Sequence, residues 1–486
     1  MSSIEVREDT EDRFRWDTIT SVFDGDGNLI ERFTENDDGT TREQLFENGI
    51  VFREVLTDDA VTSAKPWQSI ERSYDPSGNL LDSFELRDDG VTIQKDYQDG
   101  QLWTITETDI NDDGSQSDAR SWQSRFREFD DNGDMQFSFE VRDDGVTIEK
   151  DFQFGQLWTV TETDLNDDGS QSDARIWESR FTEYNDNGDL LFSFEVRDDG
   201  VTIEKDYQFG QLWTVTETDL NDDGSQSDAR IWQSRFTEYD DNGDLQFSFE
   251  VRDDGVTIQK DYQFGQLWTV TETDLNDDGS QSDARIWQFR FTEYDDNGNL
   301  QLTLEQRDDG VTIEKTYQDG VLSSVFETDL NEDGSQSDAR NWENRFTQYD
   351  ENGQKLESFE LRDNGVTIAT QYENGVISAR IMEDRDEFGA MTDAEAWDTF
   401  IFIYDENGKL ASRRVDFDDG DVTVDLFEDG QNAVRLQVDG DDDKPWYLRE
   451  TLYAEDGSVA EINTYAAPED VPSQYDFLSD EMVFVA

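Results

Sequence analysis

Apolar and polar residues alternate along most of the chain in short runs that glycine turns interrupt. In the run 190–197, apolar residues recur at every second position from Leu190 to Val196, and polar residues fill the positions between them. The run 201–209 shows the same period of two. Asn-Gly, Asp-Gly and Phe-Gly dipeptides bound these runs, and Asn-Gly and Asp-Gly supply the positive φ angles that tight hairpins need. The pattern predicts antiparallel β-strands and no helix.

The strand pattern recurs with a period of 55 residues over most of the chain. Tryptophan marks the period at positions 16, 67, 122, 177, 232, 287, 342, 397 and 446. Four predicted strands lie in each unit, so eight full units and a truncated ninth predict roughly thirty strands. The units at the two ends diverge most from the others, as is typical of repeats that cap an array.

We predict an all-β fold built as a coiled or solenoidal meander of about eight four-stranded antiparallel units. Each sheet is expected to have one apolar and one polar face, so the apolar face must be covered. An eight-bladed β-propeller is the alternative, because four strands form its unit and the chain begins and ends inside a repeat. The expected regions are an N-terminal capping repeat (1–66), six central repeats (67–396), divergent C-terminal repeats (397–465) and a tail (466–486).

Several short motifs resemble those of known repeat families. The segments "YDDNGDLQF" (239–247), "YDPSGNLLDSF" (74–84) and "YQDGQLW" (97–103) resemble the tyrosine–aspartate repeats of RHS-type shell proteins. They are also similar to the β-meanders of MORN-variant repeats. The resemblance implies an antiparallel meander that wraps on itself, and it implies no activity.

The composition narrows the chemistry of the chain. Its 486 residues carry a formal charge of −81, with 120 acidic against 39 basic residues and neither Cys nor His. This excludes disulfides, thiolate nucleophiles, zinc or haem ligation by Cys or His, and binding to nucleic acid phosphates. Aromatic residues make up 12% of the chain, which indicates a folded protein despite its charge. Hard cations with oxygen ligands are the expected inorganic partners.

An acidic loop, "DLNDDGSQSDAR" at 164–175, recurs five times with at most one change. Asp, Asn and Asp at loop positions 1, 3 and 5, followed by Gly at position 6, resemble the first half of an EF-hand or dockerin calcium loop. Arg stands at position 12, where an EF-hand has a bidentate acid, so Asp at position 10 is expected to complete the site. The predicted calcium ligands are Asp109, Asn111, Asp113, Asp118, Asp164, Asn166, Asp168, Asp173, Asp219, Asn221, Asp223, Asp228, Asp274, Asn276, Asp278, Asp283, Asp329, Asn331, Asp333 and Asp338.

The alternative interpretation of these loops is a hairpin connection whose Asp and Asn side chains bond their own backbone. The "RDDG" and "YDDNG" segments are expected to be turns of that kind. The copy at 383–393 keeps part of the spacing and predicts a poor site, whereas the copies at 57–66 and 439–445 predict none. A unit such as 176–230 has 14 acidic and 4 basic residues, so a bound divalent ion would offset part of its charge of −10.

Other functional classes receive less support from the sequence. We expect the tryptophans to form a stacked core rather than a sugar-stacking surface; four of them (103, 158, 213 and 268) share a second position in the central repeats. Carboxylate pairs are too abundant to single out a glycosidase site. No Ser-His-Asp set, phosphate loop or dinucleotide fingerprint is present, so we expect no enzymatic activity.

The two ends of the sequence bear on localisation. The first residues lack the basic start and apolar run of a signal peptide, and no apolar run is long enough for a membrane helix. The last residues, 479–486, resemble the uncleaved signal of type I secretion substrates. The same residues also fit an apolar final strand that caps the array. We therefore expect a secreted or surface-associated, calcium-stabilised structural or adhesive protein. It could self-associate. The alternatives are an adhesin for a glycan or protein, and an acidic cytoplasmic protein of a halophile without metal sites.

Overall fold

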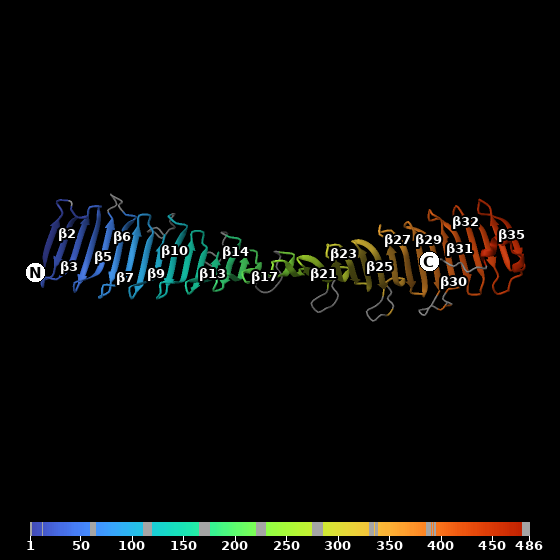
Figure 1. Ribbon diagram of the computed structural model, residues 1–486, viewed down its shortest axis with the longest axis horizontal. Helices are drawn as coiled ribbons and strands as arrows, with labels where there is room; N and C mark the ends of the chain where they lie inside the picture. Colours follow the sequence, from blue (N-terminus) through green and yellow to red (C-terminus); the bar gives the residue numbers. More distant parts are fainter. Residues whose placement is uncertain are drawn as a thin grey trace. The chain divides into compact units, whose positions relative to one another are not determined.

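The computed structural model forms two compact units, Met1–Asp244 and Leu245–Ala486 (Figure 1). The structure describes residues 2–11, 13–58, 65–109, 119–164, 175–219, 230–274, 285–329, 335, 339–384, 390, 392 and 395–478.

The first unit contains eighteen strands among its described residues. They are β1 (Ser3–Glu8), β2 (Trp16–Phe23), β3 (Leu29–Asn36), β4 (Thr40–Glu47), β5 (Ile50–Asp58), β6 (Trp67–Tyr74), β7 (Leu80–Arg87), β8 (Thr92–Gln98), β9 (Gln101–Thr108), β10 (Trp122–Phe129), β11 (Met135–Arg142), β12 (Thr147–Gln153), β13 (Gln156–Thr163), β14 (Trp177–Tyr184), β15 (Leu190–Arg197), β16 (Thr202–Gln208), β17 (Gln211–Thr218) and β18 (Trp232–Tyr239).

The second unit continues the four-strand pattern and adds two short 3-10 helices near its end. Its elements are β19 (Leu245–Arg252), β20 (Val256–Gln263), β21 (Gln266–Asp274), β22 (Trp287–Tyr294), β23 (Leu300–Arg307), β24 (Val311–Gln318), β25 (Val321–Asp329), β26 (Trp342–Tyr349), β27 (Lys355–Arg362), β28 (Val366–Glu373), β29 (Val376–Asp384), β30 (Trp397–Tyr404), β31 (Leu410–Phe417), β32 (Val422–Glu428), β33 (Gln431–Val438), β34 (Leu448–Tyr453), β35 (Val459–Tyr465), η1 (Pro468–Asp470) and η2 (Ser473–Leu478).

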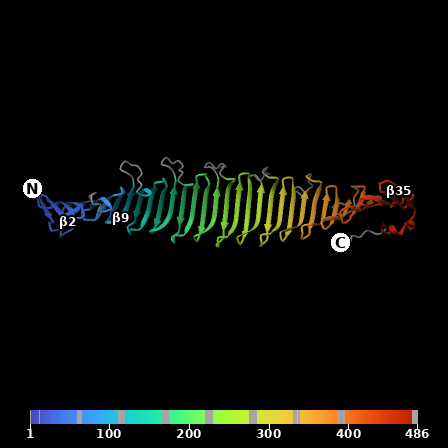
Figure 2. The ribbon, with the colours of Figure 1, turned by 90° about the horizontal axis from the view of Figure 1, so that it is seen from above.

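Within each unit, every strand pairs antiparallel with the next strand in the sequence. Pairing continues across the repeat junctions, where Val215 of β17 lies opposite Thr237 of β18. The same holds in the second unit, where β25 pairs with β26. A propeller would interrupt the ladder between blades, so the propeller alternative is wrong and the repeated antiparallel meander is confirmed. Figure 2 shows strands of the first unit side by side in a single layer, and Figure 1 shows them twisting progressively from β2 to β17.

The register distributes apolar residues over both faces of the sheet. Glu195 of β15 lies opposite Ile203 of β16, and Phe194 lies opposite Glu204. Directly opposed residues share a face, so the apolar positions of β15 and β16 point to opposite sides. The expectation of one apolar and one polar face is therefore wrong. Alternation within a strand was visible in the sequence, but the register that relates one strand to the next was not.

The turns use their own side chains as hydrogen-bond acceptors, as predicted for the "YDDNG" segments. Asp240 Oδ1 accepts the backbone N–H groups of Asn242 and Asp244, at 2.8 and 2.9 Å. In an "RDDG" turn, Asp199 Oδ1 accepts the N–H of Val201 at 3.2 Å. These contacts explain why Asp and Asn recur at these positions without any ligand.

Small apolar clusters join neighbouring repeats. In the first unit, Val201, just before β16, and Ile203 within it pack with Trp232 of β18 and with half-buried Val215 of β17. Trp232 is the marker of the next repeat, so the core lies across the repeat junction. Arg235 covers the indole, with its guanidinium 4.7 Å from the ring centroid. Equivalent clusters are centred on Trp122, Trp177, Trp287 and Trp342.

Candidate metal loops and aromatic recesses

The five predicted calcium loops connect the fourth strand of one repeat to the first strand of the next. The structure describes only their first predicted ligand, which is Asp109, Asp164, Asp219, Asp274 or Asp329. The other fifteen predicted ligands lie outside the described residues, and these are Asn111, Asp113, Asp118, Asn166, Asp168, Asp173, Asn221, Asp223, Asp228, Asn276, Asp278, Asp283, Asn331, Asp333 and Asp338.

The first Asp of each loop closes the loop through the backbone. Asp164 is fully buried, and its Oδ2 accepts the N–H of Arg175 at 2.6 Å. Its own N–H donates to the carbonyl of Glu178 at 2.7 Å. The carboxylate-to-Arg N–H bond spans 2.5 to 2.6 Å in all five loops. One carboxylate oxygen thus fixes the loop entrance to its exit.

The second oxygen of each of these carboxylates is buried as well. Oδ1 of Asp109, Asp164, Asp219, Asp274 and Asp329 has no hydrogen-bond partner among the described residues. A buried charged oxygen without a partner is costly, so a site of this kind gains free energy from any cation or donor that reaches it.

In the sixth loop, after β29, both oxygens of the corresponding Asp have hydrogen-bond partners. Asp384 is also fully buried, and its Oδ2 accepts the N–H of Glu395 at 2.8 Å. Here Oδ1 accepts the hydroxyl of Thr392 at 2.5 Å. This loop, predicted to be a poor site from its broken spacing, therefore satisfies one oxygen with a backbone N–H group and the other with a side-chain hydroxyl.

The two terminal loops keep the loop-closing carboxylate despite losing the ligand spacing. Asp58 Oδ2 accepts the N–H of Lys65 at 2.8 Å, and Asp439 Oδ2 accepts that of Lys444 at 2.9 Å. A buried Asp at the end of the fourth strand therefore closes the loop by accepting a backbone N–H, in regular and terminal repeats alike. Only in the five regular loops does the sequence follow this Asp with the alternating Asp and Asn residues that are the predicted ligands.

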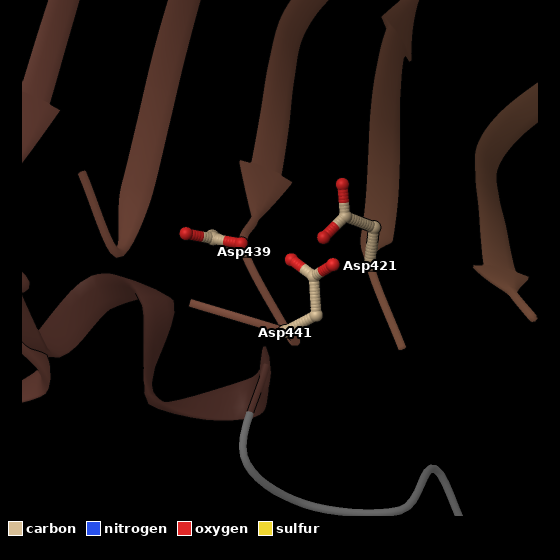
Figure 3. A group of neighbouring side chains, drawn as sticks. All are labelled: Asp421, Asp439 and Asp441. Carbon is tan, nitrogen blue, oxygen red and sulfur yellow. The ribbon is translucent and has the colours of Figure 1, made fainter. Parts of the chain in front are cut away.

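A carboxylate cluster lies at the last loop, where the sequence predicts no metal site. Asp421, Asp439 and Asp441 bring their oxygens within 4.8 Å of one another (Figure 3). Burial acts to raise the pKa of Asp421, but the hydrogen bonds from Lys444 and the Gly440 N–H lower it overall. Lys444 Nζ lies 2.8 Å from Asp421, so an ammonium group already occupies part of this cluster.

Each of the five regular loops also braces the turn between the second and third strands of its repeat through an ion pair. Arg175 Nη2 donates to Asp144 Oδ2 at 2.8 Å, and the four other regular loops repeat this contact. In the sixth loop both partners change: Asn364 Nδ2 donates to Glu395 Oε1 at 3.0 Å. Sequence reasoning missed this brace, although the matched change at a spacing of 31 residues would have revealed it.

The tryptophans fall into two classes. Those at the first repeat position in the central repeats, such as Trp232 at 3% exposure, form the predicted core. The expectation is wrong for the second position, where Trp103, Trp158, Trp213 and Trp268 are 45–46% exposed. These residues lie on the fourth strand, next to the hairpin turn that joins it to the third.

Three of the exposed tryptophans stand beside a phenylalanine in a strained backbone conformation. Phe154, Phe209 and Phe264 have φ of 52–53° and are 87–91% exposed. The left-handed region costs a residue other than Gly about 1–2 kcal/mol, and it is uncommon for bulky side chains. The period of two over 201–209 predicts that Phe209 continues the strand, but the structure places it in the turn after β16. We call Phe154/Trp158, Phe209/Trp213 and Phe264/Trp268 the aromatic pairs.

Open recesses lie beside two of the aromatic pairs. One, of about 220 Å³, is lined by Gln153, Phe154, Gln156, Leu157, Trp158, Asn185 and Asp186. The other, of about 280 Å³, is lined by Gln263, Phe264, Gln266, Leu267, Trp268, Asp295 and Asp296. Each recess combines aromatic rings, glutamine amides and the acidic turn between the next two strands.

Comparisons with known proteins leave the chain without an assigned family. Neither a family model nor a curated protein matches the sequence. Solved structures that align with it include a TcdB2-TccC3 structure without its hypervariable C-terminal region, at 10% identity and a TM-score of 0.16. That alignment covers 93% of this chain, and the chain spans 30% of the TcdB2-TccC3 length.

Two other solved structures align over most of their own length. They are a putative 6-phosphogluconolactonase from Bacteroides uniformis, at 11% identity and a TM-score of 0.11, and BamB from Moraxella catarrhalis, at 12% and 0.12. The first covers 66% of this chain and 94% of its own, and the second covers 81% and 96%. Similarities this low carry no argument about function.

The described residues contain no helix that is long and apolar enough to cross a membrane. The tail residues 479–486, in which the sequence suggests a secretion signal, lie outside the part that the structure describes.

Proposed function

We propose that this chain is a non-enzymatic, secreted or surface-associated β-repeat protein with a structural or adhesive role. Calcium bound in the five regular loops stabilises it. The observation that carries the proposal is that the second oxygen of the five buried carboxylates has no hydrogen-bond partner among the described residues and stands at the start of loops with alternating Asp and Asn. Asp58 and Asp439 of the terminal loops also leave this oxygen without a partner among the described residues, but the alternating Asp and Asn do not follow them. In the sixth loop, where the ligand spacing is lost, Thr392 supplies a partner for that oxygen.

The charge of the chain supports a role for cations. With a formal charge of −81, the folded chain repels itself, and divalent ions held between strands would offset the repulsion locally. A site that is filled at a free calcium concentration of 100 times its Kd stabilises the fold by about 2.7 kcal/mol. Secretion into millimolar calcium would therefore favour folding outside the cell.

Calorimetric titration of the purified chain with calcium tests the proposal. We expect about five ions per chain, in line with the alternating oxygen ligands of the five loops. Asp164→Asn keeps an oxygen that can accept the Arg175 N–H but removes the charge, so it is expected to lower the stoichiometry by one. Asp384→Asn is the matched control, because both oxygens of Asp384 are already bonded, and it is expected to leave the stoichiometry unchanged.

A second measurement tests whether the ions stabilise the fold. The melting temperature is expected to rise with calcium and fall with EDTA, and circular dichroism follows the strand content. Absence of calcium binding, or an identical melt in calcium and EDTA, would refute the proposal.

A further inference from the structure

We propose that the three aromatic pairs bind a neutral polysaccharide, with a sugar ring stacked on the exposed aromatic rings of each pair. The site consists of the hairpin turn between the third and fourth strands, the exposed Trp that follows it, and the next acidic turn. It is separate from the calcium loops, whose buried carboxylates belong to a different connection of the repeat.

The backbone of the turn gives the first reason to expect a ligand. In the other five repeats, the position with positive φ holds Asn or Asp, namely Asn48, Asp99, Asp319, Asn374 and Asp429. Those residues tolerate the left-handed region, whereas Phe does not. The three Phe side chains are also almost fully exposed, so folding does not repay the strain through burial. A contact between these rings and a molecule outside the chain would offset the backbone strain.

The chemistry of the recess indicates what that molecule is. Phe154 and Trp158 offer flat apolar rings, which match the C–H face of a pyranose ring. Gln153 and Gln156 are exposed on either side of the turn, and Asp186 of the next acidic turn also lines the recess. Amide and carboxylate groups around an apolar floor are suited to the hydroxyl groups of a sugar.

The negative charge of the chain favours a neutral polymer over an anionic one. The repeat 176–230 has a net charge of −10, and each recess contains acidic residues of the neighbouring turn. An anionic polysaccharide, a nucleic acid or an anionic membrane surface would be repelled. A neutral chain of sugars meets no such penalty.

The spacing of the pairs favours a polymer over a single sugar. In the first unit, Phe154/Trp158 and Phe209/Trp213 lie four strands apart, which is roughly 19 Å at the usual strand separation. Identical weak sites at a fixed interval suit a ligand that is itself periodic, because binding at one site raises the effective concentration at the next.

The test uses residues that the chain itself places at these positions. A triple variant, Phe154→Asn, Phe209→Asn and Phe264→Asn, is expected to fold at least as well as the parent because Asn tolerates the turn. A second triple variant, Trp158→Ser, Trp213→Ser and Trp268→Ser, introduces the residue found at the equivalent Ser323. Affinity electrophoresis with hydroxyethylcellulose, xyloglucan and a soluble β-1,3-glucan, in calcium, provides the measurement, with alginate as the charged control.

We expect at least one neutral polymer to retard the parent and to lose about tenfold or more in affinity for either triple variant, which corresponds to about 1.4 kcal/mol. Alginate is expected to cause no retardation. Three results would overturn the proposal: no retardation by any neutral polymer, equal retardation of parent and variants, or self-association by sedimentation that both variants abolish. The calcium stoichiometry of the variants is expected to stay unchanged, so failure here is distinguishable from failure of the calcium proposal.

Discussion

Central and terminal repeats fill the same cross-strand position with opposite chemistry. In the central repeat, Lys205 of β16 lies opposite Val215 of β17, and Val215 packs into the apolar cluster beneath Trp232. In the last full repeat, the equivalent pair is Asp425 and Arg435, and Asp425 is fully buried. The backbone register is the same, so one strand pairing supports either an apolar or an ionic core.

The first repeat also has a polar, ionic pair at this cross-strand position, with different residues. Gln44 lies opposite Glu54, which is 2% exposed. Arg42, Gln44 and Arg72 donate to its carboxylate at 2.6, 3.0 and 3.0 Å. A buried carboxylate needs all of these donors at once, so it fixes the strand register more narrowly than a valine does. The repeats next to the chain ends therefore hold their register through charge, and the central repeats through the tryptophan clusters.

The largest expected effect comes from breaking the central cluster. Trp232→Ala removes a side chain that is 3% exposed and leaves a cavity against Val201 and Ile203. Core aromatic truncations of this kind destabilise by about 3–5 kcal/mol. Trp213→Ala is the matched control, since Trp213 is 45% exposed, and its effect on stability is expected to stay below about 1 kcal/mol. Chemical denaturation followed by circular dichroism measures both; similar losses would contradict the two classes of tryptophan.

An intermediate effect is expected from the ionic core of the first repeat. Glu54→Gln leaves Arg42 and Arg72 without their shared carboxylate, and we expect a loss of about 2 kcal/mol. The two arginines are partly exposed, so water screens part of the effect. Glu204→Gln, at an exposed position on β16, serves as the control. Hydrogen exchange of β4 and β5 localises the loss, and protection equal to the parent's would contradict it.

Lowering the pH is expected to destabilise the ionic core of the first repeat more than the tryptophan clusters of the central repeats. Burial acts to raise the pKa of Glu54, but the hydrogen bonds and charges of Arg42 and Arg72 outweigh it, so the pKa lies below its ordinary value of 4.5. A carboxyl with a lowered pKa stabilises the fold above that ordinary value and loses its contribution as the pH falls through the folded pKa.

Hydrogen exchange between about pH 7 and pH 3 measures this difference. Protection of β4 and β5 is expected to fall with pH more steeply in the parent than in Glu54→Gln. Parallel pH profiles for the parent and the variant would show that Glu54 does not carry the acid sensitivity.

The smallest effect is expected from the brace between loop and turn. Arg175→Glu places a carboxylate against Asp144, in an exposed ion pair worth about 0.5 kcal/mol. Adding Asp144→Asn recreates the Asn364–Glu395 arrangement of the sixth loop and is expected to restore stability. A double-mutant cycle measures the coupling, and strictly additive losses would show that the two side chains do not interact.

The sequence predicted the strands, their number and the repeat period well, because alternation and Gly turns are local signals. It failed on the relation between adjacent strands: the opposite facing of Phe194 and Ile203 depends on register, which no single strand encodes. For the metal loops, it predicts ligand positions, of which only the first in each loop lies among the described residues. It could not predict that Asp164 would use one oxygen to close the loop and bury the other.

The exposed tryptophans were mispredicted for a related reason. Trp213 and Trp232 both lie in strands and recur with the same period, so periodicity cannot distinguish a core ring from a surface ring. Phe209, four residues before Trp213, occupies a turn position that elsewhere holds Asn or Asp. This neighbour marks the three aromatic pairs but not exposure itself, because Trp103 is equally exposed and follows Asp99. A bulky residue at a position that requires a left-handed backbone is a local clue to function.

The placement of apolar residues on both faces has a consequence for how such a chain changes in evolution. A repeat of this kind has no closed interior. The first strand of the following repeat completes its apolar cluster. Duplicating or deleting one 55-residue unit would therefore add or remove a complete cluster without exposing another. Copy number becomes an adjustable quantity, and with it the number of loops and aromatic pairs that one molecule presents.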